Sequence, residues 1–182
     1  MSNNLYQNIR LMLWDVDGVL TNGDIYISDI GECFKQFNVK DGVAVALLKK
    51  HGIKTGVLSG KHSSSLTKRC EQLDLDIIKT GIHNKMSALN DICAYLNISL
   101  NQIAYIGDDV IDFKVMQSVG LTFAPADAHS LIINVADHIT IAAGGKGVAR
   151  EAAEILLSHS GYSIESMYKP LLDDWNNLEV VQ

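Results

Sequence analysis

The sequence has few cysteines, no excess of basic residues and no long apolar run. Its three cysteines are widely spaced and have no histidine at metal-ligand spacing, so we expect reduced thiols and no disulfide framework. Lysine and arginine number 15 against 21 acidic residues, which argues against binding to nucleic acid or to a membrane surface. No apolar run approaches the ~18 residues of a membrane span. The first residues also lack the basic and apolar regions of a signal peptide, and we expect a cytoplasmic protein.

The composition is that of a folded domain. The chain has 182 residues, of which 47% are apolar and 20% charged, and this is enough to bury a sizeable core. Predicted strands alternate with predicted helices of about ten to fifteen residues, which indicates an α/β fold with a doubly wound parallel sheet. Neither a repeat nor a low-complexity linker interrupts this pattern. Residues 1–182 are therefore predicted to form one domain, with a C-terminal tail over 160–182 that shows no clear periodicity.

The chain is organised around residues 11–20, where an apolar run ends in Asp15, Val16, Asp17 and Gly18. The run predicts a short buried strand followed by a turn. Side chains two apart on a strand point the same way, so we expect both carboxylates at the carboxyl end of this strand, where open α/β sheets bind ligands. Two buried carboxylates are costly unless a cation or a proton compensates them. The structural alternative is a turn that merely reverses the chain.

Residues 24–37 show a strand–turn–strand pattern, unlike the alternation of strands and helices in the rest of the chain. Two alternating segments, 24–28 and 33–37, flank a turn and predict a β-hairpin inserted after the first strand. An isolated two-stranded hairpin is marginally stable in water, and the apolar residues of this one have no obvious local partner. Packing on the body of the protein or on another subunit would bury them.

Two more predicted strands end in polar residues suited to phosphate chemistry. Ser59 and Gly60 follow the second core strand, and Gly107, Asp108 and Asp109 follow a later one. The carboxyl ends of parallel strands lie at one edge of a sheet, so residues far apart in the sequence converge there. Taken singly, Ser59-Gly60 is also explained as a turn and Asp109 as a helix cap.

Lys85 stands at the start of a predicted helix, from which it could reach the same edge, and Asp112 follows Asp108 by four residues. Alone, Lys85 is explained as a solvated helix residue and Asp112 as surface charge. The occurrence of all these residues in order, at successive strand or helix ends, favours a common site.

Phosphoryl transfer would use each of these groups. Asp15 can attack phosphorus as a nucleophile, and Asp17 can protonate the leaving oxygen and later accept a proton from water. Mg²⁺ prefers oxygen ligands, which Asp15, Asp108 and the backbone carbonyl of Asp17 would supply. Lys85 would neutralise charge in the transition state. The predicted phosphate-binding residues are Ser59, Gly60 and Lys85.

The order of these residues resembles the haloacid dehalogenase-like (HAD) phosphatases, over residues 9–157. The four motifs of that superfamily correspond to Asp15-x-Asp17-Gly18, Ser59, Lys85 and Gly107-Asp108-Asp109-x-x-Asp112. The sequence is most similar to a small subgroup without a cap domain, the phosphatases of 3-deoxy-D-manno-octulosonate (KDO) 8-phosphate. The matching stretches are residues 14–23, 37–42, 105–109, 124–129 and 144–151.

The resemblance implies Mg²⁺-dependent hydrolysis of a phosphorylated sugar acid in the synthesis of lipopolysaccharide precursors. It also implies a homotetramer in which the hairpin of one subunit helps to cover the active site of a neighbour. Asp109 and Asp112 would support the site from behind. The sugar acid would be contacted by residues among Lys61, Arg69, Gly144, Gly145 and Arg150.

The sequence departs from the family pattern at Lys61, because Ser59-Gly60-Lys61 stands where the family usually has Thr-Gly-Arg. Lysine keeps the charge of arginine but loses its bidentate geometry for a carboxylate. Close relatives act on nine-carbon sugar acids phosphorylated at position 9, so the sequence leaves the choice of sugar open.

Two other classes of protein share part of this pattern. A receiver-like signalling module is also a small doubly wound domain with a Mg²⁺ site, but its phosphorylated aspartate is on the third strand. Here the Asp-x-Asp pair follows the first strand, and Asp17 supplies the acid and base needed for turnover. A non-catalytic scaffold of the same fold would not require Asp15, Asp17, Lys85 and Asp108 together.

Overall fold

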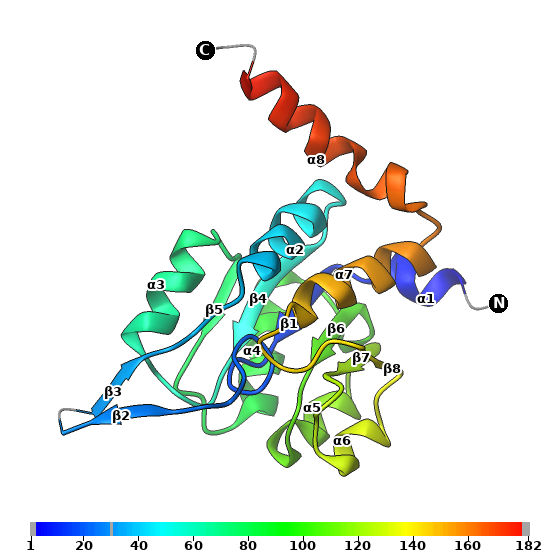
Figure 1. Cartoon of the computed structure of the whole chain (residues 1–182). Helices are drawn as coiled ribbons and strands as arrows, with labels where there is room; N and C mark the ends of the chain where they lie inside the picture. The colour runs from blue at the N-terminus through cyan, green and yellow to red at the C-terminus, as the bar shows by residue number, and fades with distance from the viewer. Residues whose placement is uncertain (1–2, 30, 180–182) are drawn as a thin grey trace.

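The computed structural model describes residues 3–29 and 31–179, and a six-stranded sheet forms its centre (Figure 1). Its strands are β1 (Leu11–Trp14), β4 (Lys54–Leu58), β5 (Ile77–Lys79), β6 (Ile103–Ile106), β7 (Leu121–Ala124) and β8 (His138–Ile139). The order across the sheet is β5-β4-β1-β6-β7-β8, and every neighbouring pair is parallel. The α/β fold with a parallel sheet is confirmed.

Helices and short 3-10 turns connect the strands. Three of the longer helices begin at a polar side chain that accepts a hydrogen bond from their first turn, as Asn38, Ser63 and Asn84 do for α2, α3 and α4. The helices are α1 (Asn3–Asn8), α2 (Val39–Lys50), α3 (Ser64–Gln72), α4 (Lys85–Leu96), α5 (Phe113–Met116), α6 (Ser130–Ile133), α7 (Val148–His159) and α8 (Ile164–Glu179), with 3-10 turns η1 (Leu100–Gln102) and η2 (Val110–Asp112).

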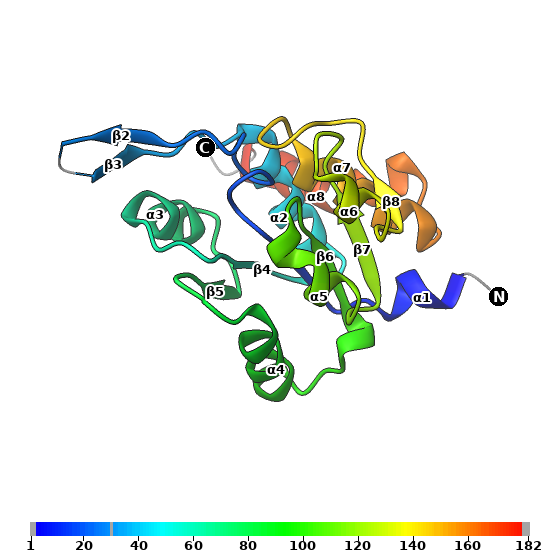
Figure 2. The same cartoon turned by 90° about the horizontal axis from the view of Figure 1, so that it is seen from below.

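The sheet is covered on both faces, which follows from the alternation of side chains along its strands. In β1, Met12 and Trp14 join the core under α2 and α7. Leu11 and Leu13 join a second core under α4 and α5. Figure 2 shows α2 and α7 on one side of the sheet and α4 on the other. A residue that follows β1 on the side of Leu13 therefore faces the start of α4.

The predicted hairpin is present as β2 (Tyr26–Ser28) and β3 (Gly31–Phe34), which pair antiparallel outside the main sheet. Ile30, in its turn, lies outside the described residues. The rings of Tyr26 and Phe34 stack with their centroids 4.4 Å apart. Figures 1 and 2 show the hairpin extending away from the body, and 72% of Ile27 is exposed.

The C-terminal tail contains a long helix, α8, which its sequence pattern does not predict. Met167 and Leu171 are buried on its inner side, and the carbonyl of Met167 lies 2.8 Å from Nε2 of His51 at the end of α2. These tertiary contacts, made despite Pro170 inside the helix, explain why local sequence is a poor guide here. Residues 180–182 lie outside the described chain. In the part that the structure describes, no helix is long and apolar enough to cross a membrane.

Candidate active site

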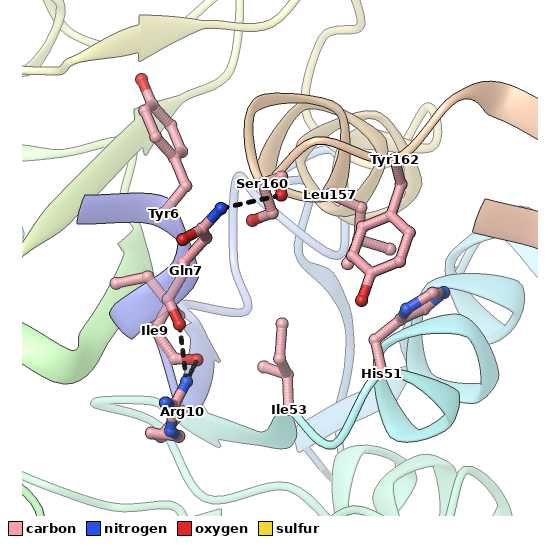
Figure 3. Close-up of a pocket in the computed structure, with 9 residues that line it drawn as sticks. All are labelled: Tyr6, Gln7, Ile9, Arg10, His51, Ile53, Leu157, Ser160 and Tyr162. Carbon is pink, nitrogen blue, oxygen red and sulfur yellow. Dashed lines mark hydrogen bonds between the residues drawn. The ribbon is translucent and has the colours of Figure 1, made fainter. Parts of the chain in front are cut away.

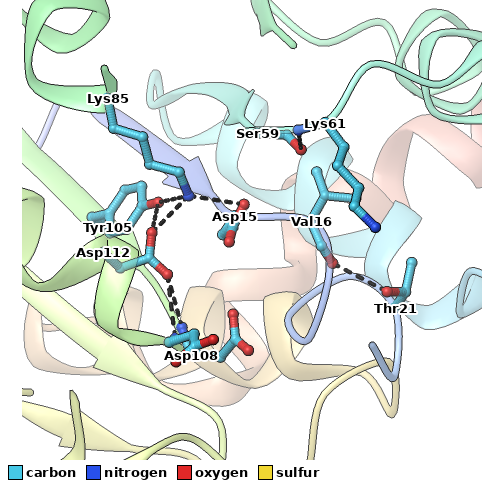
Figure 4. Close-up of polar contacts among 10 residues, drawn as sticks. Asp15, Val16, Thr21, Ser59, Lys61, Lys85, Tyr105, Asp108 and Asp112 are labelled. Atoms are coloured by element: carbon cyan, nitrogen blue, oxygen red, sulfur yellow. Dashed lines mark hydrogen bonds and ion pairs between the residues drawn. The ribbon is translucent and has the colours of Figure 1, made fainter. Parts of the chain in front are cut away.

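Asp15 follows β1 directly, on the side that faces α4. Its backbone N–H donates to the carbonyl of Ile106 over 2.9 Å, which continues the parallel pairing and fixes the carboxylate at the sheet edge. Only 4% of Asp15 is exposed. Its Oδ1 lies 3.0 Å from Nζ of Lys85, the first residue of α4 (Figure 4). The predicted convergence of Asp15 and Lys85 is therefore present.

Asp112 links the other groups of the site and is fully buried. Its Oδ1 accepts hydrogen bonds from Nζ of Lys85 over 2.7 Å and from the hydroxyl of Tyr105 over 2.6 Å. Its Oδ2 accepts from the backbone N–H groups of Asp108 and Asp109, over 3.1 and 3.4 Å. Asp112 thus holds both the lysine and the loop that carries Asp108, and the surface-charge alternative for it is wrong. Asp109 caps the following turn through Val110 N, as its structural alternative supposed.

Carboxylate oxygens of Asp15, Asp108 and Asp112 lie within 4.8 Å of one another. Burial, followed by the charge of Asp112, raises the pKa of Asp15 to about 7. Burial and the charge of Asp15 raise the pKa of Asp108 to about 8. Burial lowers the pKa of Lys85, but Asp15 and Asp112 reverse this and leave it raised, so the amine stays charged. One ammonium opposite three carboxylates leaves negative charge to be compensated.

This cluster fits a divalent cation with a preference for oxygen. Oδ1 of Asp108 is buried and has no hydrogen-bond partner among the described residues, although a buried carboxylate oxygen normally has one. Mg²⁺ binds through one or two carboxylates together with substrate phosphate, and it would supply the missing partner and charge. The side-chain cluster contains Asp112 beside the predicted Asp15 and Asp108. The backbone carbonyl of Asp17 remains a predicted ligand.

Asp17 is placed by a turn, because β1 ends at Trp14 and its alternation does not reach so far. Gly18 follows with φ +89°, and a Cβ there would lie 2.0 Å from Oδ2 of Asp108. Glycine is required at this position because it alone lets the turn approach Asp108 so closely. The carboxylate of Asp17 pairs with Nζ of Lys35 from the root of the hairpin.

Ser59 lies at the end of β4, as predicted, and is 1% exposed. Its N–H donates to the carbonyl of Lys79, and its Oγ accepts from the N–H of Lys61 over 3.3 Å, so the loop through Gly60 folds back on the hydroxyl. In the view of Figure 4, Ser59 and Lys61 lie on one side of Asp15, and Lys85 and Asp112 lie on the other.

The glycine-rich loop, residues 144–147, packs on the turn after β1. Gly144 N–H donates to Oδ1 of Asp127 over 2.9 Å, and Gly145 N–H donates to the carbonyl of Val19 over 2.9 Å. A Cβ on Gly144 would lie 2.1 Å from the carbonyl oxygen of Gly18. These glycines therefore support the turn that carries Asp17.

The two arginines expected near the substrate have partners elsewhere. Nε of Arg150 lies 3.1 Å from both Oε1 of Glu154 and the hydroxyl of Tyr168 in α8. Nη2 of Arg69 donates to the carbonyl of Asn38 over 3.5 Å. Their contacts with a sugar acid remain predictions.

Three residues at or beside the site were missed. Tyr105 carries a polar tip at a buried strand position, which was an available signal. Lys35 lies just beyond β3, and nothing in the alternation of the hairpin shows that it turns inward. Oδ1 of Asp41 in α2 accepts from the N–H of Ala149 over 3.1 Å and caps α7 across 108 residues of sequence. A contact at that separation leaves no local pattern.

A cavity of about 230 Å³ lies at the opposite edge of the sheet, near the starts of β1 and β4 (Figure 3). Two of its polar side chains are already engaged: Nη1 of Arg10 donates to the carbonyls of Gln7 and Ile9, and Nε2 of Gln7 donates to the carbonyl of Ser160. It contains none of the carboxylates described above, so the chemistry belongs to the carboxyl edge.

Comparison with known proteins gives a consistent result. The family model of haloacid dehalogenase-like hydrolases matches residues 71–151. The KDO 8-phosphate phosphatase KdsC of Escherichia coli K12 is 41% identical over 155 residues, which are 85% of this chain and 82% of that protein.

Two solved structures have similar folds. The KDO 8-phosphate phosphatase of Yersinia pestis is 37% identical, with a TM-score of 0.83 over 87% of this chain and 86% of that one. The Moraxella catarrhalis enzyme, in complex with magnesium ion, phosphate ion and KDO, is 32% identical, with a TM-score of 0.82 over 86% of this chain and 90% of that one. The chain therefore belongs to the haloacid dehalogenase-like hydrolases, in the phosphatase family that these relatives represent.

Proposed function

We propose that the protein is a Mg²⁺-dependent phosphomonoesterase that acts through an aspartyl-phosphate on Asp15. The observation that carries this proposal is the buried contact of Asp15 with Lys85, beside the carboxylates of Asp108 and Asp112. A carboxylate held against an ammonium at the edge of a parallel sheet is positioned to attack a phosphate that the same ammonium attracts. The receiver-like alternative lacks a use for Asp17.

In the proposed reaction an oxygen of Asp15 forms a bond to phosphorus while the bond from phosphorus to the sugar oxygen breaks. Asp17 gives its proton to the leaving oxygen. Water then attacks the aspartyl-phosphate, and Asp17 accepts a proton from that water, which releases phosphate and restores Asp15. Lys85, Ser59 and the N–H groups near Gly60 hold the phosphate oxygens.

Asp15, Asp108 and the carbonyl of Asp17 would hold Mg²⁺, with Asp112 behind them. When bound, the cation supplies positive charge that offsets the carboxylates and the phosphate. Lys85 keeps its own role without it, because two carboxylates hold its proton.

The proposed substrate is KDO 8-phosphate, cleaved to KDO and phosphate for lipopolysaccharide precursors in the cytoplasm. The names and the 39–41% identity of the relatives support it. A nine-carbon sugar acid 9-phosphate is the alternative substrate. The proposal also includes the organisation of the chain as one domain with a hairpin over 24–37, and its assembly as a homotetramer. The exposed Ile27 and Phe34 on the hairpin support burial by another subunit.

A phosphate-release assay tests the function. The wild-type protein with Mg²⁺ should cleave KDO 8-phosphate faster than a nine-carbon sugar acid 9-phosphate and faster than hexose phosphates. Asp15→Asn should lower kcat by on the order of 10³-fold or more, because it removes the nucleophile. Asp91→Asn, an exposed carboxylate on α4, is the control and should retain activity. Turnover that persists in Asp15→Asn would refute the mechanism, and faster cleavage of the nine-carbon ester would replace the substrate.

A further inference from the structure

A lysine with a buried side chain, Lys35, reaches the candidate site from the root of the hairpin, where β3 joins the body. Lys35 follows β3, and its Nζ lies 2.5 Å from Oδ1 of Asp17 and 3.4 Å from Oε2 of Glu32. The Lys35 side chain is only 2% exposed, whereas Asp17 and Glu32 keep 26% and 24% of theirs. The two carboxylates therefore form the accessible side of this group.

This contact differs from an ordinary surface ion pair. Lys68 and Glu71 in α3, for example, lie 4.0 Å apart with side chains 71% and 58% exposed, and such pairs contribute little. An ammonium removed from water costs free energy unless it is well compensated. Lys35 is also in contact with Asp17, the residue proposed to protonate the leaving oxygen. Its position therefore marks the leaving-group side of the phosphorus atom.

We propose that Lys35 and Glu32 form the leaving-group subsite of their own chain and bind the hydroxyl groups of a polyhydroxylated leaving group. This inference rests on the proposed function, since it uses the role given to Asp17. A sugar hydroxyl can donate a hydrogen bond to the partly exposed carboxylate of Glu32, which the buried ammonium of Lys35 holds in place. The pair thus matches a sugar hydroxyl, and a leaving group without hydroxyls would gain little from it.

The assignment to the same chain follows from the geometry. Lys35 and Asp17 lie 18 residues apart on one chain, at the root of the hairpin. The exposed apolar residues offered to a neighbour, Ile27 and Phe34, lie on the same two strands, and Glu32 in β3 turns its carboxylate to Lys35 instead. The ion-paired side chains therefore complete the site in cis, and the exposed apolar side chains remain free for another copy.

Ligand selectivity tests the subsite. In Lys35→Met, binding of the product KDO to the Mg²⁺-loaded protein, measured by calorimetry, should weaken about 10- to 100-fold, the range for hydrogen bonds to a charged group. Binding of inorganic phosphate should change less than about 2-fold, because phosphate lies on the other side of the scissile bond. Lys68→Met, the matched control, should leave both unchanged. Equal weakening for both ligands, or none, would overturn the proposal.

Kinetics give the same comparison. For Lys35→Met, kcat/KM should fall about 10- to 100-fold more with KDO 8-phosphate than with phenyl phosphate, because only the sugar ester offers hydroxyls to the subsite. A wild-type protein that releases no phosphate from either ester would refute the proposed function alone, since the calorimetric comparison does not require turnover.

Mixing two defective variants tests the cis assignment. Chains with Asp15→Asn and chains with Lys35→Met are refolded or co-expressed together under different tags. A site with an intact Asp15 then always lacks its own Lys35, so we expect KDO 8-phosphate turnover to stay at the level of Lys35→Met. Activity restored in mixed assemblies would show that a neighbour supplies the lysine and would overturn the assignment. The assemblies are first purified through both tags, so that every oligomer measured contains chains with an intact Lys35.

Discussion

The hydroxyl of Tyr105 donates to Oδ1 of Asp112 over 2.6 Å, and both side chains are fully buried. The same oxygen receives Nζ of Lys85 over 2.7 Å. A tyrosine beneath the sheet edge therefore sets the position of the carboxylate that aligns the lysine. Burial and the charge of Asp112 raise the pKa of Tyr105, so this hydroxyl remains a donor.

Tyr105→Phe should destabilise the protein by about 1–3 kcal/mol, because it removes one of the two donors to the buried Oδ1 of Asp112. We expect kcat to fall by no more than about 10-fold, since Lys85 still contacts both Asp15 and Asp112. Urea unfolding and phosphate release measure the two effects. Tyr95→Phe on α4, where the side chain is 79% exposed, is the control. Equal stability of the two variants would contradict the network.

Mg²⁺ should stabilise the wild-type protein against heat. A ligand at 100 times its Kd adds about 2.7 kcal/mol to the free energy of unfolding, which is a measurable rise in Tm. Asp108→Asn should abolish most of this rise, because it removes a ligand whose Oδ1 has no partner among the described residues. Differential scanning calorimetry with and without Mg²⁺ tests this, and Asp91→Asn should respond like the wild type. A full Mg²⁺ response in Asp108→Asn would place the cation elsewhere.

Asp41 should make stability depend on pH. Burial raises its pKa from 3.8 to about 6, although the N–H groups of Arg150 and Ala149 lower it in part. The folded state then holds a proton that the unfolded state has released, so this residue's contribution to stability falls as pH rises from about 4 to 6. Above pH 6 the loss is complete.

Asp41→Asn keeps an acceptor for the N–H of Ala149 and removes the charge. Relative to the wild type, it should gain up to about 3 kcal/mol of stability between pH 4 and pH 7. Urea unfolding across this range measures the difference, with the exposed Asp173→Asn as control. A difference independent of pH would show that Asp41 stays ionised throughout.

Two glycine substitutions separate backbone strain from displacement of Asp108. Gly18 and Gly52 both have positive φ, +89° and +72°, so alanine costs roughly 1–2 kcal/mol at each. Only at Gly18 does the new Cβ meet Asp108, because no described atom lies within 4 Å of a Cβ at Gly52. Gly52→Ala should keep the rise in Tm on adding Mg²⁺, and Gly18→Ala should lose it. The same Mg²⁺ response in both variants would contradict the close approach.

The sequence predicted the sheet and the convergence of Asp15, Lys85 and Asp108, because hydrophobic alternation and strand-end polarity are local signals. It also predicted the hairpin. It missed α8, whose stability comes from packing against α2 and α7. The role of Asp112 was underestimated because it depends on contacts with Tyr105 and Lys85. The direction of a side chain after a turn depends on tertiary contacts, which no local pattern shows.

Long side chains were the least predictable part of the site. The family resemblance places Arg150 near the substrate, which stays a prediction, and nothing local to the sequence indicated that Glu154 and Tyr168 would contact its side chain. Lys35 drew no expectation, yet it contacts Asp17. Flexible stems reach several partners from one backbone position, so the backbone pattern alone does not select among them.

The burial of Lys85 between Asp15 and Asp112 restricts how a gene for this protein can change over generations. Loss of the lysine alone strands two carboxylates away from water, and loss of both carboxylates strands an ammonium. Each single substitution would therefore lower the stability of the protein, whereas replacing all three residues together by apolar ones would leave no unpaired buried charge. A descendant that abandoned phosphate chemistry would lose these three residues as a set.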